Sequence, residues 1–400
     1  MADPKVKFFF LVAGFEYSAK ALDFWKMCTG RVRERISFIN KTLSGSDPLV
    51  SDDCTLRFLR FNVGTGKIEV IDKAFLAASG IKDTTVNEAD WRPISSVGTG
   101  DAFDPDTFAS KGPFRALDRS SDYLNLADEY PSLDQTTAKP DVMSIVDVYQ
   151  SVRSAPPASV LELSFFSHGW VEGPILVNSN DTIHNGVLRD TSDKDGRAGL
   201  DFNLMMGVAD GAVSAMHGMQ FAGAFDPKGA LQAWGCNFDI ELRVVQQTQK
   251  AMRSARAAFT DDSVVNFEFE GWAPGRYQVV DPAAEFLPAD SSQTTLSRKF
   301  SEVKTFLRKR VAASYAFNFA SSMGRTGIGA LPGTEGDDEK SGFHLMKVCS
   351  KVNMPECPVG FAGLFDFFDK QLGIHVSDRG YGVYDPATVK RVNADLGTTP

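Results

Sequence analysis

Short apolar runs that alternate with longer amphipathic segments are the feature that most constrains how this chain of 400 residues can fold. Five runs have the apolar character of strands, and they are short enough to predict buried strands. They span residues 6–15, 55–63, 160–166, 229–234 and 264–269. Residues 19–43, 141–154 and 239–256 carry apolar positions at helical spacing. Strands that alternate with helices predict an α/β fold with a mainly parallel sheet.

Further local patterns predict where a helix begins, where a second long helix lies and where a loop follows it. Ser18 is the predicted cap of the first helix. The amphipathic pattern over residues 296–319 predicts one long helix, and residues 324–336 predict a glycine-rich loop near the rim of a site.

Long polar and glycine-rich segments interrupt the regular pattern. Residues 82–140 and 178–225 contain few periodic signals and predict irregular insertions. We therefore expect an α/β core over residues 1–270, with these two insertions. The remaining residues, 271–400, are expected either to continue the same sheet or to form a small helical region.

Charge and cysteine content exclude several classes of protein. The net charge of −9 argues against a nucleic-acid-binding protein, and the chain has no apolar stretch of about 20 residues that would span a membrane. The five cysteines are odd in number and none has CxxC spacing, so neither a disulfide framework nor a zinc site is expected. This cysteine content indicates a reducing compartment, and we expect a cytoplasmic location.

Two strand ends carry the residues best suited to chemistry. The run at 160–166 leads into Ser167, His168 and Gly169, and the run at 229–234 leads through Gly235 into Cys236. Imidazole is the usual base near neutral pH, and a thiol becomes a nucleophile when a base or a positive setting favours its thiolate. If the two strands are neighbours in a parallel sheet, both side chains lie at its carboxyl edge, where α/β folds bind ligands.

The order of these strands and motifs resembles the caspase-like cysteine peptidases of clan CD. Ser167-His168-Gly169 is similar to their histidine motif, and Trp234-Gly235-Cys236-Asn237 is similar to the cysteine motif of bacterial caspase-like domains of uncharacterised function. The resemblance covers about residues 5–270. It implies a caspase-like sheet flanked by helices and a thiol protease that hydrolyses peptide or protein substrates.

The resemblance also implies a role for each matching residue. Cys236 would attack the scissile carbonyl, and His168 would supply acid–base catalysis. Backbone N–H groups of Gly169 and Cys236 would form the oxyanion hole. Two features depart from the family: Gly235 stands where caspases carry alanine, and the 68 residues that separate His168 from Cys236 (236 − 168) require an insertion.

The sequence gives fewer indications of which residues would contact the substrate or bind an ion. Asp201 and Asp239 are candidates for an acidic lining of the substrate pocket, and the helix that starts near Asp239 would favour the Cys236 thiolate through its dipole. No metal or other cofactor is expected. The acidic loop at 190–196 resembles part of a calcium loop, but the twelfth position that should hold Glu is Phe202, so calcium binding or regulation there is a weak hypothesis.

Three alternatives stay open from the sequence. The same fold without catalysis would be a binding or regulatory protein. An esterase of the α/β-hydrolase type is weaker, because the glycine positions of its nucleophile elbow would fall on Trp234 and Phe238. His217 also precedes a glycine, but it follows no apolar strand and ranks below His168. The oligomeric state and the residue preferred beside the scissile bond are left undetermined.

Overall fold

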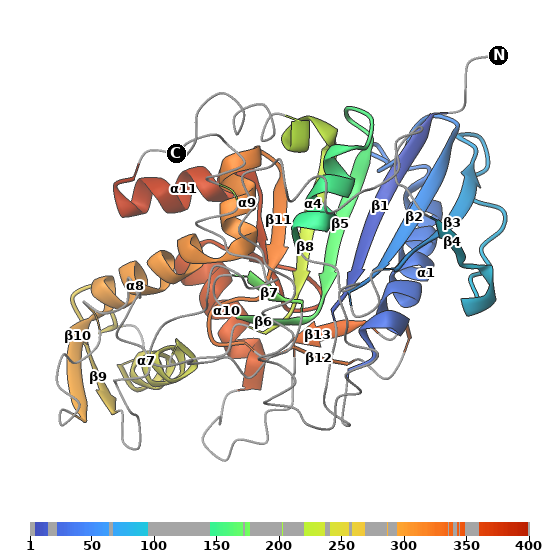
Figure 1. The fold of residues 1–400 in the computed structure, drawn as a ribbon. Helices are drawn as coiled ribbons and strands as arrows, with labels where there is room; N and C mark the ends of the chain where they lie inside the picture. Colours follow the sequence, from blue (N-terminus) through green and yellow to red (C-terminus); the bar gives the residue numbers. More distant parts are fainter. Residues whose placement is uncertain are drawn as a thin grey trace, which may run out of the picture.

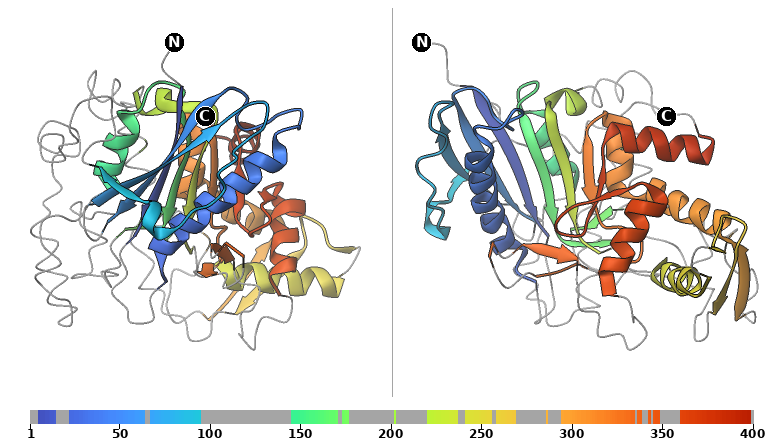
Figure 2. Two further views of the ribbon diagram at one scale, coloured as in Figure 1. Left: turned by 90° about the vertical axis from the view of Figure 1, so that its right-hand side faces the viewer. Right: turned by 180° about the vertical axis from the view of Figure 1, so that it is seen from behind.

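One nine-stranded sheet forms the centre of the described part of the chain, and helices cover both of its faces (Figures 1 and 2). The computed structural model describes residues 5–14, 22–63, 67–94, 145–170, 173–176, 202, 220–236, 241–255, 258–268, 286, 294–334, 336–338, 342–343, 345–348 and 360–398. The predicted α/β class with a mainly parallel sheet is confirmed.

The central sheet has a parallel middle and antiparallel edges. Its strands, in spatial order, are β14 (His375–Val376), β15 (Gly382–Tyr384), β11 (Thr326–Gly329), β8 (Phe225–Trp234), β5 (Val160–Phe166), β1 (Val6–Ala13), β2 (Cys54–Asn62), β3 (Lys67–Phe75) and β4 (Arg92–Ile94). The five strands from β11 to β2 pair in parallel, and the strands outside them pair antiparallel. Parallel strands end at the same edge, so their carboxyl ends share one surface.

Three short hairpins or ribbons lie outside the central sheet. They are β6 (His168–Trp170) with β7 (Gly173–Ile175), β9 (Val264–Glu268) with β10 (Thr295–Lys299), and β12 (Gly336–Asp338) with β13 (Met346–Val348). Figure 1 shows β6–β7 and β12–β13 beneath the ends of β5 and β8. These two hairpins therefore border the carboxyl edge of the sheet.

The helices sort to the two faces of the sheet. Their bounds are α1 (Phe24–Thr42), η1 (a 3₁₀ turn, Glu88–Asp90), α4 (Ile145–Arg153), α7 (Glu241–Ala255), α8 (Phe300–Ala313), α9 (Tyr315–Met323), α10 (Gly360–Leu372) and α11 (Pro386–Leu396). Figure 2 shows α1 and α4 on opposite sides of the sheet. Strand β1 explains why both faces are covered: Phe9 and Leu11 pack in the core under α1, and Phe8 and Phe10 pack in the core under α4.

The first helix starts later than the sequence pattern predicts. Residues 22 and 23 are not helical, and α1 begins at Phe24. Asp23 caps it, because its Oδ1 accepts a hydrogen bond from the N–H of Lys26 at 3.0 Å. The prediction of a helix from residue 19 was therefore wrong at this end, and Ser18, the predicted cap, lies outside the described residues.

The predicted helix over residues 296–319 was also wrong, because the segment divides into a strand and two helices. Residues 295–299 pair with β9, and α8 then ends at Ser314, whose backbone is extended. The Asn318 side chain donates hydrogen bonds to the carbonyl oxygens of Ala312 and Ser314, at 2.8 and 3.0 Å. The first bond satisfies the Ala312 carbonyl group in the last turn of α8, and the Ser314 carbonyl oxygen also accepts the backbone N–H of Asn318 at 3.0 Å, which begins α9.

Part of the predicted glycine-rich loop is an interior strand. Residues 326–329 form β11, which pairs with β8 and β15. A Cβ placed on Gly327 would lie 1.9 Å from the carbonyl oxygen of Ala316 in α9. Glycine is needed here because the helix backbone rests directly on the strand.

The two regions that the sequence marked as irregular are described in part. Within 82–140, η1 forms a 3₁₀ turn, β4 extends the sheet beyond β3, and residues 95–140 lie outside the described residues. Within 178–225, residues 220–224 lead into β8, and Phe202 packs on Tyr315 and Phe319. From the C-terminal region, β11, β14 and β15 join the central sheet. No helix in the described segments is long and apolar enough to cross a bilayer.

A buried ion cluster joins α1 to the middle of the sheet. Glu162 of β5 is fully buried and accepts two hydrogen bonds from Arg31, at 2.7 and 3.0 Å, and one from Arg35. Arg31 also donates to Oε1 of Gln232 in β8 at 2.6 Å. Burial raises the pKa of the Glu162 carboxyl, but the two arginines outweigh burial and lower this pKa to about 2.

Replacing Glu162 with Gln should leave two arginines without their buried counter-ion and lower the free energy of unfolding by about 3 kcal/mol at pH 7. The folded pKa lies below the ordinary value of 4.5, so the carboxylate stabilises the fold above about pH 4.5. This contribution is lost as the pH falls toward 2. Urea unfolding of both proteins between pH 7 and pH 3 should show the difference narrowing below about pH 4.5.

Asp72→Asn is the matched control, because Asp72 pairs with Arg57 in a half-exposed position on β3. Its loss of stability should stay below about 1 kcal/mol. Equal losses in the two variants would contradict a structural role for the buried cluster.

Candidate functional site

The register of the sheet brings His168 and Cys236 to the same level. Phe166, the last residue of β5, is the partner of Trp234, the last residue of β8, in a parallel pair. His168 and Cys236 each lie two residues beyond these partners. The two predicted residues therefore lie just beyond the ends of neighbouring strands, at the same edge of the sheet.

Two glycines let the chain segments that carry these residues touch through their backbones. A Cβ on Gly235 would lie 2.9 Å from Cα and 3.0 Å from N of Gly169. A Cβ on Gly169 would lie 3.2 Å from N and 3.0 Å from O of Cys236. Real Cβ atoms do not approach a backbone atom as closely as 2.9 Å without displacing it, so position 235 requires glycine, and a Cβ at position 169 would be tightly packed against the Cys236 backbone. Gly235, which departs from the caspase pattern, has a packing reason to be glycine here.

A small cavity joins the two strand ends. It has a volume of about 30 Å³, and His168, Gly169 and Cys236 all contribute to its wall. Ser314 and Tyr315, from the break between α8 and α9, line its other side. The break between α8 and α9, which the sequence pattern did not predict, thus places Ser314 and Tyr315 on the cavity wall.

His168 is held by contacts on its ring and on its backbone. The imidazole is half-buried and meets the ring of Phe24 edge-on, with centroids 5.5 Å apart and planes at 87°. Ser167 donates a hydrogen bond to the carbonyl oxygen of His168 at 2.7 Å. The first residue of α1 therefore restricts where the imidazole can lie.

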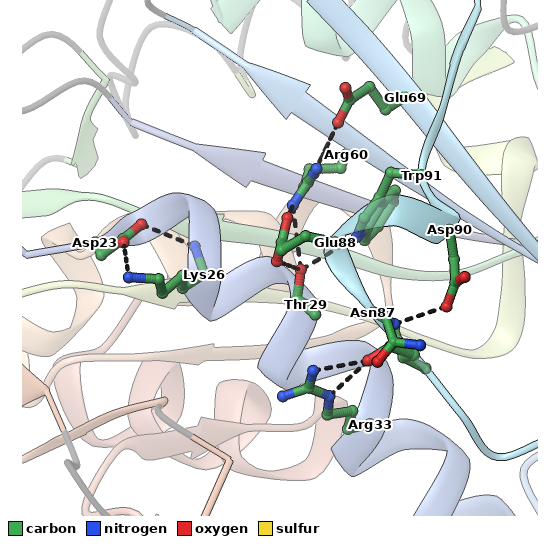
Figure 3. Close-up of polar contacts among 11 residues, drawn as sticks. Asp23, Lys26, Thr29, Arg33, Arg60, Glu69, Asn87, Glu88, Asp90 and Trp91 are labelled. Atoms are coloured by element: carbon green, nitrogen blue, oxygen red, sulfur yellow. Dashed lines mark hydrogen bonds and ion pairs between the residues drawn. The ribbon is translucent and has the colours of Figure 1, made fainter.

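A polar cluster next to the site fixes the start of α1 (Figure 3). Thr29 Oγ1 accepts hydrogen bonds from Arg60 Nη1 and Trp91 Nε1, both at 3.1 Å, and donates to Glu88. The Arg60 guanidinium lies between two tryptophan rings, 3.5 Å from the centroid of Trp25 and 4.2 Å from that of Trp91. These contacts tie the first turns of α1 to β2 and to η1, and so hold Phe24 against His168.

Cys236 contacts a segment that lies 100 residues further along the chain. The N–H of Gly336 donates a hydrogen bond to the Cys236 Sγ at 3.3 Å, and the thiol donates to the Gly336 carbonyl oxygen at 3.7 Å. A hydrogen bond donated to sulfur favours the thiolate, whereas a bond donated by the thiol favours the protonated form. Gly336 was part of the predicted glycine-rich loop, but its contact with Cys236 was not predicted.

The Trp234 ring, two residues before Cys236, packs against other aromatic rings and against Arg31 of the buried ion cluster. The Trp234 ring stacks on Phe166 at 5.7 Å and meets Tyr381 edge-on at 5.1 Å. Arg31 lies over the same Trp234 ring, 4.9 Å from its centroid, and Trp234 Nε1 donates to Ser164 at 3.2 Å. The last residue of β8 is thus immobilised on several sides.

Some predicted residues cannot be placed. Asp201 and Asp239, His217 and the acidic loop at 190–196 lie outside the described residues. The helix predicted to start near Asp239 is described only from Glu241. Within the described segments, no cluster of three His, Cys, Asp or Glu residues is arranged to hold a metal ion.

Two other cysteines provide a contrast with Cys236. Burial raises the pKa of the Cys28 thiol, which lies on the buried face of α1, and raises that of Cys54 to about 11. Both thiols are therefore protonated at neutral pH, and both suit an inert structural role. Cys236 is half-exposed and lines a cavity with a histidine, which makes it the better candidate for chemistry.

Comparisons with known proteins leave the chain without an assigned relative. No family model, no curated protein and no solved structure matches it. The interpretation of the site therefore depends on its geometry.

Gly235→Ala should force the ends of β5 and β8 apart, because the added methyl group meets backbone atoms of Gly169. We expect a loss of about 1–3 kcal/mol in the free energy of unfolding, measured by urea denaturation. Gly223→Ala is the matched control, since a Cβ there meets no atom within 4 Å. Equal stability of the two variants would contradict the close packing of the strand ends.

Proposed function

We propose that the protein is a cysteine peptidase in which Cys236 and His168 hydrolyse a peptide bond. The observation that carries the proposal is the placement of both residues beyond the paired ends of β5 and β8, on the wall of one cavity. A thiol beside an imidazole at the carboxyl edge of a parallel sheet is an arrangement suited to nucleophilic catalysis. The α/β sheet is also consistent with the caspase-like fold that the two motifs resemble.

The proposed reaction proceeds in two stages. Sγ of Cys236 forms a bond to the substrate carbonyl carbon, and the thiol proton passes to the His168 imidazole. When the tetrahedral intermediate collapses, the C–N bond breaks and His168 gives the proton to the leaving amine. A water molecule, deprotonated by His168, then attacks the thioester carbonyl carbon. The C–S bond breaks, His168 returns its proton to the Cys236 thiolate, and the acid product releases its remaining proton to solvent as the carboxylate forms.

The negative charge on the intermediate requires nearby donors. The backbone N–H groups of Gly169 and Cys236 are the proposed oxyanion hole. Support comes from the contact of the two glycine segments, which puts the Gly169 and Cys236 amide nitrogens close to the same point of backbone contact. Donors that are fixed before the reaction need no reorganisation when charge develops.

The substrate would be a peptide or a protein. A reducing compartment such as the cytoplasm is part of the proposal, because the reaction needs Cys236 as a free thiol. The residue recognised beside the scissile bond stays open, since the candidate lining residues Asp201 and Asp239 lie outside the described part of the chain.

The second candidate function is a caspase-like protein that binds or regulates without catalysis. The hydrogen bonds between Cys236 and Gly336 favour it, because they occupy the sulfur that would have to attack a substrate. A profile of cleavage on a library of quenched fluorescent peptides would separate the two functions. Hydrolysis that depends on Cys236 supports the peptidase, and its absence supports the binding protein.

His168→Ala should lower kcat/KM for the best library peptide by about 10²–10⁴-fold, the usual contribution of general acid–base catalysis. Cys236→Ala should abolish hydrolysis, because it removes the nucleophile. His375→Ala, an exposed histidine on β14, and Cys54→Ala are the matched controls and should keep the wild-type rate. Unchanged hydrolysis in either variant of the proposed dyad would refute the assignment.

A further inference from the structure

A single residue of the β12–β13 hairpin covers the Cys236 thiol with both of its backbone groups. The N–H and the carbonyl oxygen of Gly336 lie 3.3 and 3.7 Å from Sγ. Gly336 is the first residue of β12 and pairs with Val348 of β13. The thiol is therefore bound to a hairpin that follows β11 and lies far from Cys236 in the sequence.

The hairpin fits tightly at this point. A Cβ placed on Gly336 would lie 2.8 Å from Oη of Tyr381, 3.2 Å from the carbonyl oxygen of Gly235 and 3.2 Å from Cε of Met346. Gly336 thus touches the residue that precedes Cys236 as well as its own partner strand. A side chain at position 336 would require the Tyr381 hydroxyl, or the hairpin itself, to shift.

Arg379, in the turn between β14 and β15, connects the hairpin to the interior of the protein. Its carbonyl oxygen accepts a hydrogen bond from the N–H of Val348 at 2.9 Å. Its guanidinium pairs with Glu34 of α1 at 3.1 Å, and Glu34 in turn pairs with Arg31 of the buried ion cluster. Both ends of Arg379 are engaged, so it acts as an anchor for the hairpin.

The space beside the thiol is too small for a substrate. The cavity that His168 and Cys236 line measures about 30 Å³, whereas pockets that hold ligands usually measure about 300–1,000 Å³. A volume of this size accommodates about one water molecule. A peptide therefore does not fit beside Sγ inside this cavity, and Gly336, which is not among its lining residues, covers another part of the half-exposed thiol.

We propose that the β12–β13 hairpin is a latch that closes over Cys236 and must lift before the thiol can react, with Arg379 as the positioning residue that holds it shut. The identity of the excluded ligand as a peptide rests on the proposed function. The latch itself does not, because it concerns access to the thiol. In the closed state the sulfur faces the Gly336 peptide group, and lifting the hairpin breaks both hydrogen bonds and exposes the part of Sγ that Gly336 covers.

Two variants weaken the latch by different routes. Arg379→Gln removes the ion pair with Glu34 and leaves the backbone bond to Val348, and Gly336→Ala introduces the steric conflict with Tyr381 and Gly235. Arg57→Gln, in the half-exposed pair with Asp72, and Gly223→Ala, where a Cβ meets no neighbour, are the matched controls. If Gly336→Ala fails to fold, as judged by circular dichroism, Arg379→Gln decides the question.

The measurement is the second-order rate constant for alkylation of Cys236 by iodoacetamide, followed by peptide mapping so that the other cysteines do not interfere. Recording it across pH until the rate levels off separates access from ionisation, because the plateau reports a fully formed thiolate. The latch variants should raise the plateau rate about tenfold, as expected for the loss of one hydrogen bond to a charged group. The controls should match the wild type.

A plateau rate of alkylation for Arg379→Gln within about twofold of the wild-type rate would overturn the latch, because the latch predicts a rise of about tenfold. Faster alkylation without peptide hydrolysis in any variant would support the latch and count against the proposed peptidase. Hydrolysis by the wild type at the rate of the latch variants, together with unchanged alkylation, would support the peptidase and overturn the latch.

Discussion

The ion pair between Glu162 and Arg31 is the interaction on which the geometry of the site depends. Two charges removed from water cost several kcal/mol each, and the cost is offset only when the geometry is good and the remaining lone pairs and protons find partners. Here the bidentate contact meets this condition, with Arg35 and Gln232 completing the set. The pair therefore fixes the position of α1 relative to β5 and β8, the two strands that lead to His168 and Cys236.

The glycines beyond the strand ends, Gly169 and Gly235, keep the two chain segments together where the sheet pairing stops. Parallel pairing brings Phe166 and Trp234 side by side, but the residues beyond them are no longer held by the sheet. Direct contact between Gly169 and Gly235 continues the association of the two segments past the last paired residues. Larger residues at these positions would separate the segments, and Cys236 would lose its place on the cavity that His168 lines.

The sequence predicted the central strands well, and it predicted the helix boundaries poorly. Apolar runs such as residues 160–166 indicate strands that are buried on both faces, because their short length and aromatic content favour a strand over a buried helix segment. Periodicity does not reveal the break at Ser314, because α8 and α9 each carry apolar residues at helical spacing. The two helices nevertheless face different cores: Leu307 of α8 packs in the core under α1, whereas Phe319 of α9 packs in the core under α4. Periodicity also cannot recognise β11, because glycines required by the close approach of α9 resemble those of a loop.

The same limit explains which parts of the site were predicted. His168 and Cys236 could be found because each directly follows a strand that sequence patterns reveal. Phe24, Gly336 and Arg379 could not, because their roles arise from contacts between segments far apart in the chain. No local pattern distinguishes a glycine that covers a thiol from one that ends a turn.

The C-terminal part of the chain therefore belongs to the site as much as the strands that carry the two candidate residues. Arg379 receives its orientation from Glu34, which is bound to the same Arg31 that holds Glu162. The ion pairs of Arg31 with Glu162 and Glu34 thus connect strand β5 to Arg379, the residue that binds the β12–β13 hairpin. The proposed latch is therefore tied, through Arg379 and Glu34, to the same Arg31 side chain that holds Glu162 of β5.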